Sequence, residues 1–318
     1  MSQPCWLNKK SKLKKLPTSE MGILRLCVDI GNSGLRAVRL NDTFDLTDRR
    51  AWPFHPELIR IDWQPAADPS SDRDESTVPR FSSAVQRWIP QQWEWTAELQ
   101  RQLAAFWGAA ERLDGAIEWF VSSVHRPALC VLQRFVEGRA GDRLIVIDRS
   151  HIDLDVDVLV PERVGVDRLL AASAAAKLVS SRPLIVIQAG SAVTVDLVEA
   201  PGVFAGGAIM PGVPMMLRLL SRSADQLPQV AAEELIELPS LPGKDTEGAM
   251  ACGVSSAVVG GVRHLIDRYR TAAAIRSDEP ITVVLSGGDG PRLAKHIPPP
   301  MIEVEHLVLR GLAAVAAR

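Results

Sequence analysis

Two short, glycine-containing turns carry the residue types that bind phosphate groups. The first, Gly31-Asn32-Ser33-Gly34, follows an apolar run over residues 24–30, and the second, Gly190-Ser191-Ala192, follows a similar run over residues 184–187. Glycine lets backbone N–H groups approach phosphate oxygens closely, and a neighbouring hydroxyl adds a further donor. Two such turns that face each other across a cleft can hold the β- and γ-phosphates of a nucleotide such as ATP.

Charged residues flank the first turn on both sides. Asp29 stands at the tip of the first run, where it can hold Mg²⁺ directly or through water, because a hard cation prefers oxygen ligands. Arg36 follows the turn and can reach phosphate as a fixed cation. The alternative is a pair of ordinary hairpin turns with an exposed Asp and Arg. The recurrence of the pattern in both halves of the chain favours phosphate binding.

A second acidic residue, Asp167, stands next to Arg168 directly before an Ala-rich segment. A carboxylate there can take a proton from a substrate hydroxyl, while the arginine binds an anionic group. An Asp at the start of a helix can equally cap its unpaired N–H groups. Composition does not choose between these two interpretations.

The elements around the two turns repeat along the chain. Each turn joins an apolar strand to a second strand, so each half contains a hairpin, and this repetition indicates an internal duplication. Neither turn matches the dinucleotide fingerprint or the P-loop. The sequence predicts strands over 24–30, 35–40, 116–121, 184–187 and 193–198, helices over 95–112 and 169–178, and an exposed loop over 65–79.

Length and composition restrict the class of protein. The 318 residues suggest two domains, and 36 Lys+Arg against 38 Asp+Glu give a net charge of −2, which provides no general attraction to nucleic acid or membranes. No apolar run approaches the ~18 residues of a membrane-spanning helix. The four cysteines are far apart and show no zinc spacing, which favours the reduced cytoplasm. The lysine-rich run at 9–15 indicates a disordered basic extension over residues 1–21.

Further motifs, taken in chain order, match one family. The sequence resembles the type III pantothenate kinases of the acetate kinase/Hsp70/actin superfamily, from about residue 24 to the C-terminus. The matching motifs are Asp29-Ile30-Gly31-Asn32-Ser33, Ser122-Ser123-Val124, Gly165-Val166-Asp167-Arg168, Gly190-Ser191-Ala192-Val193-Thr194-Val195-Asp196, Gly206-Gly207-Ala208-Ile209-Met210-Pro211-Gly212, Leu227-Pro228, Gly243-Lys244-Asp245-Thr246 and Ser286-Gly287-Gly288-Asp289.

This resemblance implies an α/β fold of two duplicated ribonuclease H-like domains, which we place at residues 22–182 and 183–318, with an active cleft between them. It implies transfer of the γ-phosphoryl group of ATP to the primary hydroxyl of pantothenate, the first step of coenzyme A synthesis. It also implies Mg-ATP as the phosphoryl donor and a homodimer located in the cytoplasm. We expect no nucleic-acid or membrane partner. We also expect a terminal helix over 305–318 that packs on the first domain. A long helix should follow Thr246-Glu247, because these residue types suit the N-terminus of a helix.

The resemblance also assigns roles to individual residues. Asp167 matches the proton acceptor, Asp29 lies near Mg²⁺, and Thr246 matches a substrate contact made across the dimer interface. The Gly287-Gly288 turn borders the nucleotide. The expected ATP-binding residues are Asp29, Ile30, Gly31, Asn32, Ser33, Gly34, Leu35, Arg36 and Ser191, and the expected substrate-binding residues are Gly165, Val166, Asp167, Arg168 and Thr246.

Three residues depart from the family pattern. Gln188 stands where the family usually has an Asp associated with potassium or ammonium, and a neutral amide contributes no formal charge to a cation. The sequence therefore predicts weak or absent potassium activation. Ser191 replaces Thr with its hydroxyl retained, and Arg36 replaces Lys with its charge retained. Gln188 also admits an alternative function, a non-catalytic accessory transcriptional regulator, and the superfold admits a sugar or acetate kinase.

Overall fold

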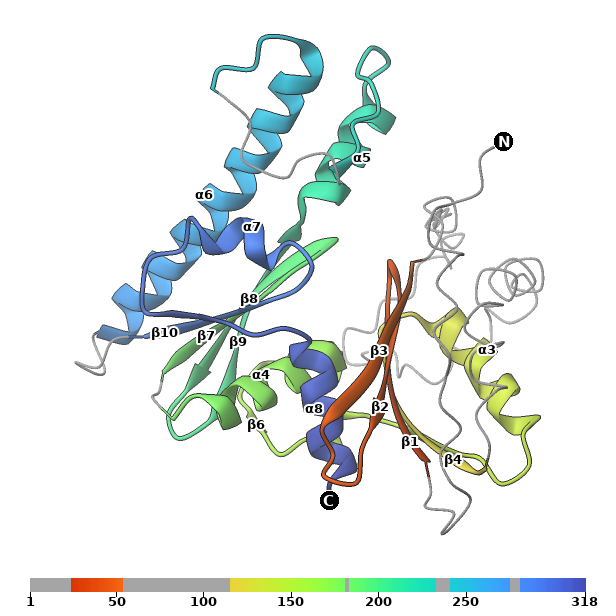
Figure 1. The fold of residues 1–318 in the computed structure, drawn as a ribbon. Coiled ribbons are helices and arrows are strands. Elements are labelled where there is room, and N and C mark those ends of the chain that lie inside the picture. The colour runs from red at the N-terminus through yellow and green to blue at the C-terminus, as the bar shows by residue number, and fades with distance from the viewer. Residues whose placement is uncertain (1–23, 54–114, 181–182, 233–240, 275–280) are drawn as a thin grey trace, which may run out of the picture.

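The computed structural model describes residues 24–53, 115–180, 183–232, 241–274 and 281–318. The basic extension expected at 1–21, the loop at 65–79 and the helix at 95–112 lie outside the described residues. The described chain forms two mixed β-sheets with helices on their faces (Figure 1).

The first sheet has the strand order β3-β2-β1-β4-β5. Strands β1, β2 and β3 are antiparallel neighbours, whereas β4 and β5 run parallel to β1. Strand β1 is buried on both faces, because Val28 and Ile30 pack in the core beneath α3 and Cys27 faces the opposite core. The elements are β1 (Leu24–Gly31), β2 (Gly34–Leu40), β3 (Leu46–Pro53), β4 (Ile117–Ser123), α3 (Arg126–Glu137) and β5 (Arg143–Val146).

The second sheet repeats this topology. Its order is β11-β10-β7-β8-β9-β6, with β7, β8 and β9 antiparallel and β10 and β11 parallel to β7. Without β6, both sheets have the same arrangement around their first hairpin, so the predicted duplication is confirmed. The elements are β6 (Asp155–Val156), β7 (Leu184–Ala189), β8 (Ala192–Glu199), β9 (Val203–Pro211), α5 (Val213–Ser223), α6 (Thr246–Ala274), β10 (Thr282–Ser286), α7 (Gly290–Ala294) and β11 (Met301–Glu303).

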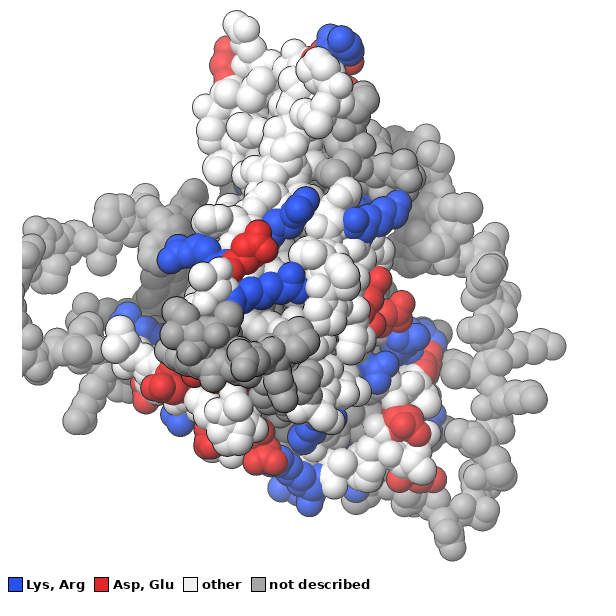
Figure 2. All heavy atoms as spheres, turned by 90° about the vertical axis from the view of Figure 1, so that its left-hand side faces the viewer, with Lys and Arg blue, Asp and Glu red and all other residues white. Residues whose placement is uncertain are grey.

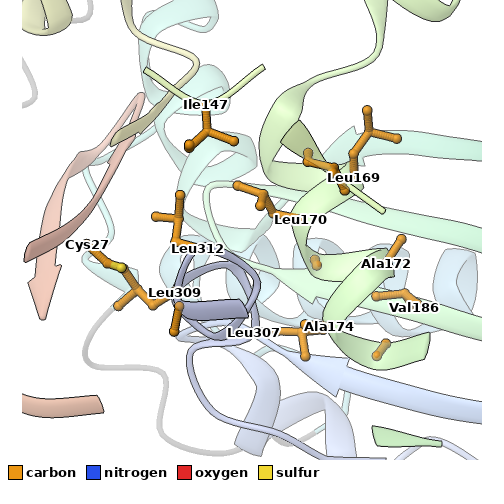
Figure 3. Close-up of a cluster of buried hydrophobic side chains, with 14 of the residues drawn as sticks. Cys27, Ile147, Leu169, Leu170, Ala172, Ala174, Val186, Leu307, Leu309 and Leu312 are labelled. Atoms are coloured by element: carbon orange, nitrogen blue, oxygen red, sulfur yellow. The ribbon is translucent and has the colours of Figure 1, made fainter. Parts of the chain in front are cut away.

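Helices α4 (Val166–Leu178) and α8 (Leu307–Ala316) lie between the two sheets. Figure 3 shows one core in which Leu170 of α4 and Leu309 of α8 meet Cys27 of the first sheet and Val186 of the second. A Cβ atom on Gly311 would lie 2.5 Å from the Leu170 carbonyl oxygen, so glycine is required where the two helices cross. The terminal helix therefore packs against the first sheet, as the sequence predicts.

The remaining elements agree with the sequence in most places. The strands expected at 24–30, 35–40, 116–121, 184–187 and 193–198 and the helix at 169–178 are all present, with ends shifted by up to three residues. Two short 3₁₀ helices, Arg149–His151 and Pro161–Arg163, lead to α4. Strand β6 joins the second sheet through β9, although it precedes the boundary placed at residue 182, and that boundary stays a prediction.

Helices α5 and α6 extend together away from the sheets (Figure 1). Val258, Val262 and Ile266 of α6 pack against the second sheet, whereas Leu219 of α5 is exposed. The expectation that no apolar segment approaches the length of a membrane span is wrong, because Thr246–Ala272 is long and apolar enough by length and composition alone. The core helix of a soluble protein passes the same test. Figure 2 shows a part of this extension with few charges above a region of mixed charge.

Candidate active site

The two glycine-containing turns meet in the structure. Ser33 lies between β1 and β2, Ser191 lies between β7 and β8, and their hydroxyl groups are in hydrogen-bonding contact although 158 positions separate them. Within the second turn the Gly190 N–H donates to the Ala192 carbonyl over 3.1 Å. The Gly212 N–H, which follows β9, donates to the Ser191 carbonyl over 2.8 Å. The paired turns of the two halves thus form one locus.

Glycines make room for the backbone at the end of β7. Gly287 has φ of +104°, and a Cβ atom there would overlap the Ala189 backbone. A Cβ atom on Gly212 would likewise overlap the Gly190 carbonyl. The Asp289 N–H donates to the Ala189 carbonyl over 3.1 Å, which joins the turn after β10 to the end of β7. The Gly287-Gly288 turn therefore lies beside the glycine-containing turn at Ser191.

Asp29 is buried at the end of β1, directly across from Arg36 on β2. Arg36 Nη1 lies 3.6 Å from Asp29 Oδ2, while about half of the arginine side chain remains exposed. Burial raises the pKa of Asp29 from 3.8 to about 6, the charge of Arg36 lowers it, and the charge of Asp167 raises it further. The alternative of an ordinary turn with an exposed Asp29 is therefore wrong.

Asp167 lies in the first turn of α4 and does not cap it. The N-cap residue is Gly165, whose cap position makes no side-chain hydrogen bond, and the Arg168 N–H donates to Asp167 Oδ1 over 2.8 Å. A Cβ atom on Gly165 would lie 2.5 Å from that oxygen, so glycine leaves room for the carboxylate. Burial raises the pKa of Asp167, although the N–H and the charge of Arg168 lower it. A partly buried carboxylate with a raised pKa is suited to proton transfer.

Sequence reasoning gave no role to Asp196, which joins this cluster from β8. Its side chain is fully buried, and both carboxylate oxygens accept hydrogen bonds from Arg168. Burial raises the pKa of Asp196, Arg168 lowers it, and the charge of Asp167 raises it. The sequence feature that indicates a role for Asp196 is an acidic residue between Val195 and Leu197 in a mostly apolar strand.

Gln188 lies at the end of β7, opposite Thr194 on β8 and Ser286 on β10. Its Nε2 atom is buried and has no hydrogen-bond partner among the described residues. The structure thus presents an N–H donor where the resemblance implies a carboxylate.

Thr246 is not brought to this cluster. It is exposed at the first position of α6, and no hydrogen bond or ion pair among the described residues joins it to Asp167. Asp245 precedes it and accepts a hydrogen bond from the Gly248 N–H over 2.7 Å. Asp245, and not Thr246, therefore caps α6, which corrects the capping predicted from the sequence.

The carboxylates of this cluster would need the substrate's phosphate groups to complete a Mg²⁺ site. No three His, Cys, Asp or Glu side chains within the described ranges lie close enough to hold a metal ion by themselves. Mg²⁺ commonly binds through one or two carboxylates and completes its shell with substrate phosphates and water. A buried Asp29 beside two phosphate-type turns fits that mode.

Two sheets of one topology that meet at paired hairpin turns define the duplicated fold of the actin, Hsp70 and acetate kinase superfamily. A solved structure of a putative 2-dehydro-3-deoxygalactonokinase from Sinorhizobium meliloti aligns with 92% of this chain and 95% of its own, at 14% identity and a TM-score of 0.45. Residues 81–268 match the family model of type III pantothenate kinase. The chain belongs to the type III pantothenate kinase family.

Individual relatives agree with that membership. A type III pantothenate kinase of Zymomonas mobilis is 34% identical over 291 residues, which cover 91% of this chain and 90% of the relative. One from Rhodopirellula baltica is 41% identical over 174 residues, or 54% of this chain and 60% of the relative. One from Janthinobacterium is 36% identical over 160 residues, or 50% of this chain and 59% of the relative. In the latter two, the chain spans less than two thirds of the relative's length. These relatives lend no support to the regulator alternative.

Proposed function

We propose that this protein phosphorylates pantothenate with ATP to give 4′-phosphopantothenate. The observation that carries the proposal is the partly buried Asp167 carboxylate, held in the first turn of α4 near Asp29, in a chain that belongs to this kinase family. In the reaction, the substrate's primary hydroxyl oxygen attacks the γ-phosphorus, and the bond from that phosphorus to the β–γ bridging oxygen breaks. The hydroxyl proton passes to Asp167 and ADP leaves.

The protein's part in phosphoryl transfer is positioning and charge stabilisation. The turns at Ser33 and Ser191 offer hydroxyl and backbone donors to the phosphates, and Arg36 supplies a half-exposed cation beside them. Asp29 would hold Mg²⁺, directly or through water, and the ion would neutralise charge on the phosphate oxygens. Arg168, Gly165 and Val166 would form the substrate side of the site.

A monovalent cation fits this site poorly. Gln188 has a buried Nε2 atom with no hydrogen-bond partner among the described residues. The side chain brings no formal charge, and an N–H donor repels a cation. Its amide oxygen can still coordinate potassium after a flip of the side chain. We expect weak or absent activation by potassium or ammonium, in line with the sequence prediction.

The proposed working form is a homodimer in which Thr246 reaches the partner's site. Between Glu247 and Arg263, α6 carries no charged residue, and its exposed positions there include Gly253, Ala257 and Gly260. Small side chains permit close approach of another helix. Leu219 on neighbouring α5 exposes 59% of its surface, which supports burial against a second copy. Free thiols at Cys27, Cys130 and Cys252 support a cytoplasmic location.

A coupled ADP-release assay with Mg-ATP tests the activity. The parent protein should turn over pantothenate but not sugars or acetate, and Asp167→Asn should lower kcat by about 10²- to 10⁴-fold, the usual contribution of general base catalysis. Asp148→Asn serves as the control, because this exposed residue caps a short 3₁₀ helix and contacts Ser150 and His151, none of which belongs to the candidate site. Turnover of a sugar in place of pantothenate, or an Asp167→Asn variant as active as the parent, would contradict the proposal.

A further inference from the structure

A bidentate ion pair connects α4 to the second sheet at the candidate active site. Arg168 Nε donates to Asp196 Oδ1 over 3.1 Å and to Oδ2 over 3.3 Å, and Arg168 Nη2 donates to Oδ1. The Asp196 side chain is fully buried and that of Arg168 is 13% exposed. Two parallel N–H bonds fix the plane of a guanidinium group as well as its position.

Two residues of β9, Phe204 and Gly207, surround this ion pair. Gly207 is the strand partner of Asp196, and a Cβ atom on Gly207 would overlap Asp196 Oδ1. The ring of Phe204 lies 5.4 Å from the guanidinium carbon of Arg168, which places the cation over an aromatic face. The arginine is thus held along one edge by Asp196 and on one face by Phe204.

The same arginine holds the carboxylate next to it. The Arg168 backbone N–H donates to Asp167 Oδ1 over 2.8 Å, while the Arg168 side chain is anchored on β8. A shift of the backbone at 167–168 would therefore strain the bonds between Arg168 and Asp196. A displacement of about 1 Å in a reacting group can lower a rate about 10²-fold.

We propose that Asp196 is a positioning residue, which fixes Arg168 against β8 and thereby holds the Asp167 carboxylate at the paired turns. This inference rests on the proposed kinase activity and deepens it. With Nε and Nη2 engaged by Asp196, the guanidinium keeps Nη1 for a substrate anion, since no hydrogen bond joins that atom to the described part of the chain. Asp196 thus orients both the Asp167 carboxylate and Nη1 of Arg168.

A purely structural ion pair is the competing explanation. Replacing a buried ion pair often leaves stability unchanged, whereas removal of one partner leaves a buried charge and is destabilising. A structural role therefore predicts a loss of stability with unchanged kinetic constants in the folded protein. A positioning role predicts a loss of kcat that exceeds any change in the KM for ATP.

The chain provides a matched control for the loss of a buried carboxylate. Asp142 is 1% exposed, and it accepts a hydrogen bond from Arg139 Nε over 2.7 Å and another from Trp119 Nε1 over 2.8 Å. This pair lies in the connection between α3 and β5 and includes no residue of the candidate site. Asp142→Asn therefore removes a comparable buried charge and leaves the cluster around Asp167 in place.

The test compares the steady-state kinetics of the parent, Asp196→Asn and Asp142→Asn at a temperature at which circular dichroism shows all three folded. We expect Asp196→Asn to lower kcat about 10²-fold with the KM for ATP within about twofold of the parent, and Asp142→Asn to keep both constants. If Asp196→Asn does not fold, Gly207→Ala is judged by the same criterion. Its Cβ atom would overlap Asp196 Oδ1 and the Val195 carbonyl oxygen, and the variant keeps the carboxylate charge.

The outcomes separate this inference from the proposed function. A parent protein that does not turn over pantothenate contradicts the kinase proposal itself. An active parent whose Asp196→Asn or Gly207→Ala variant keeps its kcat within about twofold would overturn the positioning role alone. Equal losses of kcat in Asp196→Asn and Asp142→Asn would also overturn it, because any lost buried ion pair would then produce the effect.

Discussion

Asp29→Asn should make the protein more stable and less active. Burial raises the pKa of Asp29 from 3.8 to about 6, so the folded chain holds the proton more tightly than the unfolded chain does. The ionised carboxylate therefore destabilises the fold above this pKa, by about 3 kcal/mol for a rise of that size. Asparagine has nearly the same shape and carries no charge, so the substitution removes this penalty.

The pH dependence provides the sharper test. Below the unfolded pKa of 3.8 the carboxyl group is protonated in both states, and the penalty disappears. Urea unfolding in EDTA should give Asp29→Asn an advantage of about 3 kcal/mol near pH 7.5 that shrinks to about 1 kcal/mol near pH 4.5. The exposed Asp42→Asn should show no such trend. If Asp29→Asn were less stable than the parent near pH 7.5, the pairing with Arg36 would outweigh burial, and the reasoning would be wrong.

Three further substitutions address the cation site, the helix crossing and the dimer. Gln188→Asp should make ADP release faster in potassium than in sodium buffer, whereas the parent should respond equally to both, as a coupled assay will show. Gly311→Ala should lower the free energy of unfolding by about 1–3 kcal/mol in urea, because its Cβ atom would meet the Leu170 carbonyl at 2.5 Å. Ala257→Arg, on the uncharged exposed side of α6, should convert the dimer to monomers in sedimentation velocity, whereas the control His264→Arg on the same helix should not.

The sequence predicts the elements of this fold well because their signals are local. Apolar runs bounded by glycine turns gave both hairpins, and the Ala-rich segment gave α4, since these patterns depend on a few adjacent residues. The family motifs placed Asp29, Asp167 and Arg168 in one site. The sequence alone did not show that Asp29 is buried, because burial of the end of β1 depends on neighbours from distant parts of the chain.

The role of Asp196 was less accessible to sequence reasoning for a similar reason. Its partner Arg168 is 28 positions away and on another element, and the space it occupies exists because Gly207 on the next strand lacks a side chain. Capping of α6 was assigned to Thr246 because Thr and Asp are both favourable N-cap residues. Only the hydrogen bond from Gly248 shows that Asp245 holds that position.

The distribution of cations within the carboxylate cluster agrees with the proposed role of Asp167 as the base. Asp29 has Arg36 as its side-chain partner, and Asp196 has Arg168, whereas the hydrogen bond shown for Asp167 comes from a backbone N–H. An arginine beside a carboxylate favours its charged form, although burial outweighs this effect and leaves the pKa of both Asp29 and Asp196 raised. Under the proposed mechanism, Asp29 serves metal binding and Asp196 orientation. Asp167, partly buried and without a guanidinium bond of its own among the described residues, is the carboxylate that the proposal assigns to receive the substrate's proton.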